Sequence, residues 1–263
     1  MPALSIADRM TLANVTAEMG LKSAAFPPDD KLADYFGDYA VQGVWADLDA
    51  MYYKEFEVDL AQVIPLVMEV GEINEIKAPG EWGRLEIQQG LIGACASGRL
   101  EDLRVVARIL DGKKIASGFQ LSIVPASREI YLQAIQEGII DRLVKSGASI
   151  LGSSCGPCLG SSHMIMADTR RFITTVNSNS MRRLSAIGVE KYVASPATVA
   201  MTALTGVLTV EVERTDAKYP YWEMPKVWVT VNEFERRYHN RVWNYGDLNS
   251  IACEQLFDEA CTY

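Results

Sequence analysis

Between residues 85 and 206, predicted elements follow one another in a recurring order: an apolar strand, a loop with glycine and an amphipathic helix. The apolar residues from Leu100 to Leu110 recur at spacings of three and four, which places them on one face of a helix. Alternating strands and helices predict an α/β fold, in which helices cover both faces of a mostly parallel sheet to give three layers, α/β/α. The predicted strands are residues 85–92, 119–124, 148–151, 172–176 and 192–194, and the predicted helices are residues 100–110, 127–138, 139–147 and 195–206.

Capping residues support the predicted helix boundaries. Ser127 and Ser195 are favourable N-caps, and Pro196 suits the first position of a helix. Gly206 stands where a helix is expected to end. A further helix is predicted over Thr11–Lys22, before the repeating units begin.

Three cysteines follow the ends of predicted strands. Cys95 follows the first strand, and Cys155 and Cys158 form a Cys-x-x-Cys motif much later in the chain. Ligands bind beside the carboxyl ends of the strands in such sheets, so we expect these loops and Asn177 to meet at one site. Three thiolates on a four-iron cluster would leave one iron without a protein ligand, whereas electron-carrying clusters normally take four cysteines.

The residues alone leave other interpretations of the cysteines open. A zinc ion could bind all three together with His163, because three cysteines and one histidine form a normal zinc site. Alternatively, the cysteines could be buried thiols that bind no metal. A thioredoxin-like redox pair is disfavoured, because the motif does not open the expected fold at the right place. Cys253 and Cys261 are interpreted as incidental thiols.

Composition excludes several classes of protein. The chain has 263 residues, of which 49% are hydrophobic and 22% are charged, an ordinary globular profile. Its net charge of −9 argues against a nucleic-acid partner and against an anionic membrane surface. No apolar run reaches the roughly 18 residues of a spanning helix, and the first residues lack the pattern of a secretory signal. We therefore expect a cytoplasmic protein without a disulfide framework.

Four motifs occur in order over about residues 5–210: Asp8–Gly20 with Arg-Met-Thr-Leu-Ala-Asn, Gly93–Arg104 with Gly-Ala-Cys-Ala-Ser-Gly-Arg, Cys155–Gly160 with Cys-Gly-Pro-Cys-Leu-Gly, and Ser195–Gly206 with Ser-Pro-Ala-Thr-Val-Ala. As a set they resemble the aconitase superfamily, most closely the C-terminal half of the large subunits of 3-isopropylmalate dehydratase and homoaconitase. The resemblance implies a [4Fe–4S] cluster on Cys95, Cys155 and Cys158, with an open iron for a carboxylate and a hydroxyl of the substrate. It also implies a three-layer domain like the third domain of aconitase.

The resemblance assigns substrate contacts to the loop that follows residue 175. It implies that Asn177 lies beside the cluster and that Arg183 binds a substrate carboxylate. Ser178 stands where the family has an arginine, and Arg182 stands where it has a glycine. One guanidinium is therefore missing, and Arg182 is the candidate that could replace its charge.

Two further pairs of residues lie within the motifs. Asn14 and Glu18 are four positions apart on one helix face, so they could reach the cluster region or bond to each other. Arg99 and Asp102 are interpreted as structural residues that hold the Cys95 loop at the start of the next helix.

Three parts of the chain are expected. Residues 1–84 are a partial aconitase-type domain of helix and loop segments, and residues 85–210 are the cluster-binding α/β domain. Residues 211–263 are a β-rich extension, in which Arg241–Asp247 resembles the start of the small swivel domain. The resemblance implies that two partners supply the missing parts, namely the N-terminal half of the large subunit, with its acid–base residues, and a small swivel-domain subunit.

The expected function is the cluster-binding part of a split hydro-lyase that acts on a small di- or tricarboxylic hydroxy acid. No catalytic acid or base is assigned within the chain. The altered arginine loop favours an alternative, a catalytically inactive Fe–S or metal-binding module for assembly or regulation. A zinc-stabilised structural domain is a third hypothesis.

Overall fold

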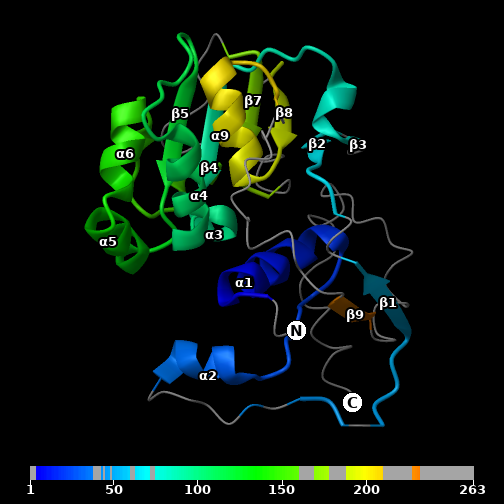
Figure 1. Ribbon diagram of the computed structural model, residues 1–263. Helices are drawn as coiled ribbons and strands as arrows, with labels where there is room; N and C mark the ends of the chain where they lie inside the picture. The colour runs from blue at the N-terminus through cyan, green and yellow to red at the C-terminus, as the bar shows by residue number, and fades with distance from the viewer. Residues whose placement is uncertain are drawn as a thin grey trace.

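The computed structural model describes residues 4–37, 43, 45–47, 49–59, 63–71, 75–159, 169–177, 188–209 and 227–231 (Figure 1). No helix within these ranges is long and apolar enough to cross a membrane.

Seven strands form the central sheet: β2 (Val67–Glu69), β3 (Glu75–Lys77), β4 (Gln89–Gly93), β5 (Gln120–Val124), β6 (Ser149–Ile150), β7 (Arg171–Thr174) and β8 (Glu190–Val193). Their order across the sheet is β3-β2-β8-β7-β4-β5-β6. The five strands from β8 to β6 are parallel, while β2 and β3 join one side of the sheet antiparallel. The predicted α/β fold with a mostly parallel sheet is confirmed.

The sheet begins earlier in the chain than the pattern predicts. β2 and β3 precede residue 85, where we expected the cluster-binding domain to start, yet both strands belong to its sheet. Each has only three residues, which is too short for an alternating pattern to be visible in the sequence. A 3₁₀ helix, η4 (Pro79–Trp82), connects β3 to the parallel strands.

Helices cover one face of the sheet. The principal ones are α4 (Leu100–Leu110), α5 (Arg128–Gln136), α6 (Ile139–Ser146) and α9 (Pro196–Thr205). α4 packs between α6 and α9 over β4 and β5 (Figure 1). Leu103 of α4 and Leu143 of α6 are fully buried in the same core as Ile123 of β5. Burial of each such side chain stabilises the fold by about 1.5–3 kcal/mol.

The opposite face carries a smaller core. Leu91 of β4, Phe172 of β7 and Val176 pack there with Cys158, which lies on the short helix α7 (Gly156–Leu159). Neighbouring residues on β4 point to opposite faces, so Leu91 joins this core and Ile92 joins the larger one. Ala94 belongs to the same core, so the start of the Cys95 loop packs on this face together with α7.

The predicted caps are present. Ser127 Oγ accepts the backbone N–H of Ile130 at 3.2 Å, and Ser195 Oγ accepts that of Thr198 at 3.2 Å. Gly206 ends α9 in the left-handed conformation, with φ of 71°.

The region before Leu66 has a different organisation. Helix α1 (Ile6–Val15) begins at the capping box of Ser5 and Asp8 and continues into η1 (Thr16–Met19), so it starts earlier than the predicted helix. α2 (Asp30–Phe36) follows, and then β1 (Lys54–Val58). β1 pairs antiparallel with β9 (Val227–Val231), which comes from the C-terminal extension. Segments near the two ends of the chain therefore share a separate two-stranded sheet (Figure 1).

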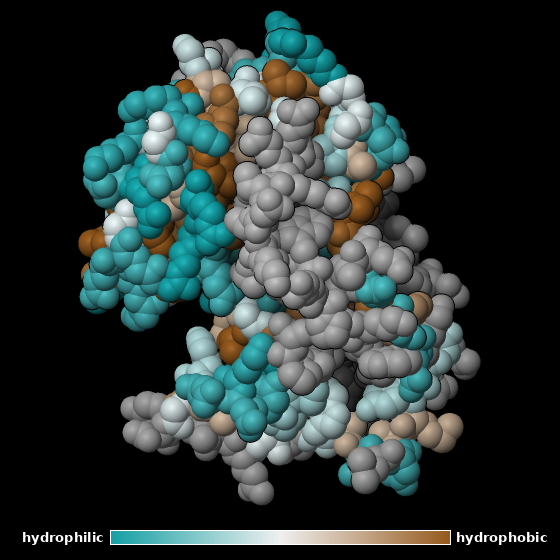
Figure 2. Space-filling model, viewed as in Figure 1, coloured by the Kyte–Doolittle hydropathy of each residue, from teal (hydrophilic) through white to brown (hydrophobic). Residues whose placement is uncertain are grey.

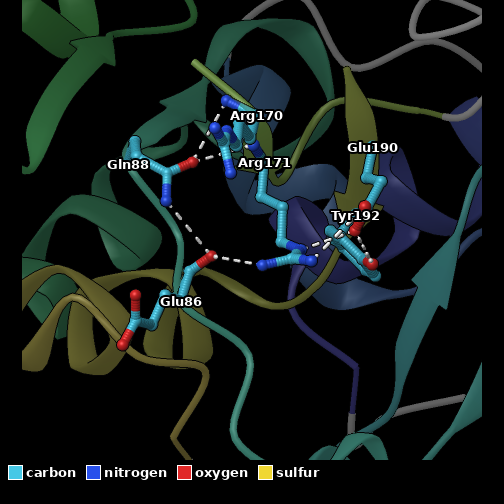
Figure 3. A network of polar contacts seen from close by, with 6 residues as sticks. All are labelled: Glu86, Gln88, Arg170, Arg171, Glu190 and Tyr192. Carbon is cyan, nitrogen blue, oxygen red and sulfur yellow. Dashed lines mark hydrogen bonds and ion pairs between the residues drawn. The ribbon is translucent and has the colours of Figure 1, made fainter. Parts of the chain in front are cut away.

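A polar network ties together the amino ends of β4, β7 and β8 (Figure 3). Gln88 Oε1 accepts the backbone N–H of Arg171 at 2.9 Å. Arg171 Nε donates to Glu190 at 2.5 Å, and the hydroxyl of Tyr192 donates to the same carboxylate at 3.0 Å. Burial, together with this contact, raises the pKa of Tyr192 well above its usual range. The network fixes the register of these strands at their amino ends, which lie at the end of the sheet opposite the cysteines.

Candidate metal-cluster site

The Cys95 loop makes a sharp turn directly after β4. Gly93 has φ of 115°, and a Cβ atom there would lie 2.1 Å from the carbonyl oxygen of Val124. A Cβ atom on Gly98 would lie 2.5 Å from the same oxygen. Only glycine fits at either position, because the neighbouring backbone of β5 approaches too closely for a side chain. The short helix α3 (Ala94–Ser97) between them presents Cys95 to solvent.

The turn also stores backbone strain. Ala94 has φ of 58°, and it is the only residue other than glycine with a positive φ in the described part of the chain. A side chain in this conformation costs about 1–3 kcal/mol and persists only where the surrounding structure enforces it. Such strain is common at functional sites, and here it lies next to the proposed ligand.

Helix α1 packs against this loop through polar side chains. Asn14 Nδ2 lies 3.5 Å from Cys95 Sγ, and Thr11 Oγ1 donates to the carbonyl oxygen of Ala96 at 2.8 Å. Asn177 Nδ2 donates to Asn14 Oδ1 at 3.3 Å. Of the two alternatives for Asn14, the structure shows the one in which it reaches the site. Asn14 links Cys95 to Asn177, although the three residues come from distant parts of the sequence.

Cys155 and Cys158 lie on the loop that follows β6. Cys155 is exposed, whereas Cys158 is buried in the smaller core. Burial, and then the nearby charges of Cys95 and Cys155, raise the pKa of the Cys158 thiol to about 11. Cys158 packs in the same buried cluster as Ala94, the residue before Cys95, so the two loops lie close together at this end of the sheet.

Hydrogen bonds between strand ends hold the loops in place. Thr175 Oγ1 accepts the backbone N–H of Gly93 at 2.8 Å, and Thr174 Oγ1 donates to the carbonyl oxygen of Leu91 at 2.9 Å. The end of β7 is thereby fixed to the end of β4, which puts Asn177 near Cys95. Nothing in the sequence distinguishes Thr174 and Thr175, because threonine is common in strands and its hydrogen-bond partner on another strand cannot be identified from the sequence.

Arg99 and Asp102 hold the other end of the Cys95 loop, as their position at the start of α4 predicts. The backbone N–H of Arg99 donates to Asp102 Oδ2 at 3.0 Å, and Arg99 Nη2 lies 3.4 Å from the carbonyl oxygen of Cys95. Burial raises the pKa of Asp102 to about 6, although the hydrogen bond from Arg99 opposes the rise. The charges of Glu101 and Asp8 add to the effect of burial.

The three cysteines suit one kind of metal site better than another. Among the described residues, no group of three or more His, Cys, Asp or Glu side chains could hold a single metal ion. A four-iron cluster differs, because each cysteine binds a separate iron around a larger core. Three thiols from two loops, without a carboxylate among them, fit such a cluster by their chemistry.

Several predicted site residues lie outside the described ranges. They are Ser178, Arg182 and Arg183 of the expected substrate loop, His163 as the alternative zinc ligand, and Cys253 and Cys261. Their roles stay predictions.

Comparisons with known proteins agree on one family. The sequence model of the aconitase family (aconitate hydratase) matches residues 68–206. The 3-isopropylmalate dehydratase large subunit of Clostridium beijerinckii is 41% identical over 210 residues, which are 78% of this chain and 50% of that protein. The probable methanogen homoaconitase large subunit of Methanosarcina mazei is 40% identical over 209 residues, 78% of this chain and 53% of that protein.

A solved structure was also found, that of Thermococcus kodakaraensis aconitase X in its holo form. It is 21% identical, with a TM-score of 0.31, and the match covers 53% of this chain and 29% of that one. The chain thus spans about half the length of the curated relatives it matches.

Proposed function

Because this chain belongs to the aconitase family, we propose that it is the cluster-binding part of a hydro-lyase that acts on a small di- or tricarboxylic hydroxy acid. One observation carries the proposal. Cys95 and the Cys155–Cys158 motif lie on separate loops, yet Cys158 packs in one buried cluster with Ala94, the residue before Cys95. The relatives named as dehydratase and homoaconitase large subunits support the reaction class.

Cys95, Cys155 and Cys158 would hold a [4Fe–4S] cluster. When bound, the cluster would supply a Lewis acid at the iron that no cysteine ligates, which makes hydroxide a better leaving group. The residues of the chain orient and tune this group. Asn14 can donate a hydrogen bond to the Cys95 sulfur, and hydrogen bonds to ligand sulfurs set the electronic properties of a cluster. Asn177 fixes the orientation of the Asn14 amide.

Substrate recognition would fall to the loop after Asn177. Arginines bind carboxylates through paired hydrogen bonds, so Arg183 and Arg182 are the proposed contacts, with Ser178 beside them. Ser178 replaces a family arginine, which suggests a substrate with one carboxylate fewer or one held differently.

Two partners complete the proposed enzyme. The relatives are large subunits, which supports a small swivel-domain subunit as one partner. Because the chain spans about half of those large subunits, the acid–base residues would come from the part that it does not match. The competing proposal, an inactive Fe–S or metal-binding module for assembly or regulation, is favoured by the changes at Ser178 and Arg182.

The test is anaerobic reconstitution with iron and sulfide, followed by analysis of iron, sulfide and zinc in each chain. We expect four irons in the wild type and loss of the cluster in Cys95→Ser, Cys155→Ser and Cys158→Ser, whereas Cys253→Ser should retain it. About one zinc without iron would refute the cluster. Dehydration of 3-isopropylmalate by the chain alone would refute the need for partners, and a stable cluster without activity in the assembled complex would support the inactive module.

A further inference from the structure

The short helix α3, which carries Cys95, depends on groups outside it. It has only four residues, and the last four carbonyl groups of a helix have no partner within the helix. The carbonyl oxygen of Cys95 lies 3.4 Å from Arg99 Nη2. The carbonyl oxygen of Ala96 accepts the hydroxyl of Thr11, on helix α1, at 2.8 Å. Two side chains therefore help to decide the conformation of the turn that carries the proposed ligand.

Of these two contacts, the one from Thr11 has the better geometry. A hydroxyl usually donates to oxygen at about 2.7–2.8 Å, which is the length observed here. The contact of Arg99 is longer than the usual range of about 2.7–3.2 Å for an N–H donor. Ala96 is also buried, and a buried carbonyl group without a partner is unfavourable. Loss of the Thr11 hydroxyl should therefore disturb the turn more than loss of the Arg99 contact.

The Cys95 loop is fixed to the sheet at its two ends. The backbone N–H of Gly93 donates to Thr175 Oγ1 at 2.8 Å, at the start of the loop. The carbonyl oxygen of Gly98 accepts the backbone N–H of Ala126 at 2.9 Å, at the end of the loop. Cys95 lies between these two anchors. The hydroxyl of α1 reaches the backbone directly after it, so it holds the part of the loop that the two anchors do not.

Thr11 also determines where Asn14 lies. The two residues are three positions apart on α1, which places them on one face of the helix, and both contact the Cys95 loop. Asn14 Nδ2 lies 3.5 Å from Cys95 Sγ, so a small displacement of α1 would break this contact. Threonine is branched at Cβ and has few rotamers, so its hydroxyl keeps α1 and the loop at a fixed distance.

We propose that Thr11 is a positioning residue of the metal-cluster site, whose hydroxyl holds the backbone beside Cys95 so that this cysteine stays in place to bind iron. This inference rests on the proposed function. Thr11 belongs to the first sequence motif, where the sequence assigned it no role. Removal of groups that orient a metal ligand typically weakens metal binding or activity by about 10–100-fold. A contact that only stabilised the fold would have no such specific effect on the cluster.

The test uses two changes at Thr11 and one matched control. Thr11→Val keeps the shape of the side chain and removes the hydroxyl, whereas Thr11→Ser keeps the hydroxyl. Thr16→Val is the control, because Thr16 Oγ1 donates at 2.7 Å to the carbonyl oxygen of Ala13 in the same helical segment and not to the loop. Circular dichroism checks that each variant is folded, and Thr11→Ala is the second hydroxyl-free variant should Thr11→Val not fold.

The first readout is the release of iron. Each full chain is reconstituted anaerobically with iron and sulfide, and the transfer of iron to a chelator is followed over time. We expect Thr11→Val to release iron about 10–100 times faster than the wild type. Thr11→Ser and Thr16→Val should stay within about twofold of the wild type, because both keep the hydrogen bond to Ala96.

The second readout is hydrogen exchange of the cluster-free chain, which does not depend on iron. The backbone amides of residues 95–98 should exchange about tenfold faster in Thr11→Val than in Thr16→Val, because the loop opens more easily. Helices α5 and α6 are the internal reference and should not change. They lie apart from α1 (Figure 1), and their outer faces carry mostly hydrophilic side chains (Figure 2).

Two outcomes for iron release would overturn the positioning role. One is release from Thr11→Val that is as slow as from Thr16→Val, and the other is release from Thr11→Ser that is as fast as from Thr11→Val. A wild-type chain that binds no iron would contradict the proposed function instead. In that case faster exchange of residues 95–98 in Thr11→Val would still support Thr11 as the residue that holds the Cys95 loop, and unchanged exchange would overturn it.

Discussion

Two regions of this chain use apolar residues in opposite ways. From Val67 to Leu208, they fill a core between the sheet and its helices, with Leu103, Ile123 and Ile173 fully buried. From Ser5 to Leu66, the one buried side chain that the structure describes is Arg9, and many large apolar residues are exposed. The first region is stabilised by its own burial. In the second region, most side chains that the structure describes are exposed or only partly buried.

Polar contacts attach the second region to the first. Ser5 Oγ donates to Glu101 at 2.9 Å, and Asn14 and Thr11 contact the Cys95 loop. Within the second region itself, Arg9 binds Asp29 through both carboxylate oxygens. The contacts of Ser5, Thr11 and Asn14 place α1 against the Cys95 loop through polar groups, so we expect the second region to open at a lower free energy than the first.

The largest expected effect tests whether the two regions differ in stability. Leu103→Ala should lower the free energy of unfolding by about 2–5 kcal/mol, because it leaves a cavity in the core. Leu66→Ala removes the same atoms from a side chain that is half exposed, and it should cost less than about 1 kcal/mol. Urea unfolding of both variants measures the difference. Equal costs would mean that residues 45–66 already pack into a core.

A second prediction concerns the loop where the two regions meet. Gly93→Ala should destabilise the chain by about 2–4 kcal/mol, because the backbone conformation and the close approach of Val124 both exclude a side chain. Gly112 also has a positive φ, of 66°, but a Cβ atom there would meet nothing within 4 Å. Gly112→Ala should therefore cost only about 1–2 kcal/mol. If thermal unfolding shows equal losses, the approach of Val124 is looser than the structure indicates.

Local patterns in the sequence were sufficient for much of the first region. The apolar stripe of Leu100–Leu110 and the caps at Ser127 and Ser195 act within a few residues, so they predict α4, α5 and α9 well. The rule that ligands gather at the carboxyl ends of strands predicted the common location of Cys95 and Asn177.

Long-range pairing could not be predicted in the same way. β1 pairs with β9 across most of the chain, and β2 and β3 are too short to show a period. The link from Asn177 through Asn14 to Cys95 depends on how α1 packs, which no spacing within α1 specifies. Motifs within the sequence identified Cys95 and Asn177 as candidates, while tertiary packing decides that Asn14 lies between them.

The third prediction uses two carboxylates with opposite pKa changes, one in each region. Asp102 has an ordinary pKa of 3.8 that burial raises to about 6. Below pH 3.8 the protonated Asp102 contributes fully to the stability of the folded state, and this contribution is lost as the pH rises through 6. The free energy of unfolding should therefore fall over this range by roughly 1–3 kcal/mol. Asp102→Asn should flatten the profile measured by urea unfolding between pH 4 and 7.

Asp29 gives the opposite profile in the second region. Its hydrogen bond and ion pair with Arg9 lower its pKa from 3.8 to about 2, so its contribution is present above pH 3.8 and is lost as the pH falls toward 2. The protection factors of the α1 amides, which compare the measured exchange rates with the intrinsic rates at each pH, should therefore fall on acidification below pH 4, and Asp29→Asn should remove that dependence. The same pH trend in both regions would contradict the assignment of the two carboxylates.

The smallest expected effect concerns the strained turn at Ala94, where a change to glycine should stabilise the chain instead of destabilising it. Ala94→Gly relieves a positive φ that costs about 1–3 kcal/mol, and it loses about 0.5–1 kcal/mol through the greater freedom of unfolded glycine. The net result should be a gain in stability of up to about 2 kcal/mol. Ala96 lies two positions later in the same short helix, is equally buried and has no positive φ, so Ala96→Gly should destabilise by about 0.5–1 kcal/mol. Opposite shifts in the thermal midpoint, with unchanged iron content after reconstitution, would show that the strain at Ala94 belongs to the backbone of the turn. If both variants lose stability equally, the positive φ is not strained, and the comparison between the loop and the rest of the core fails at that point.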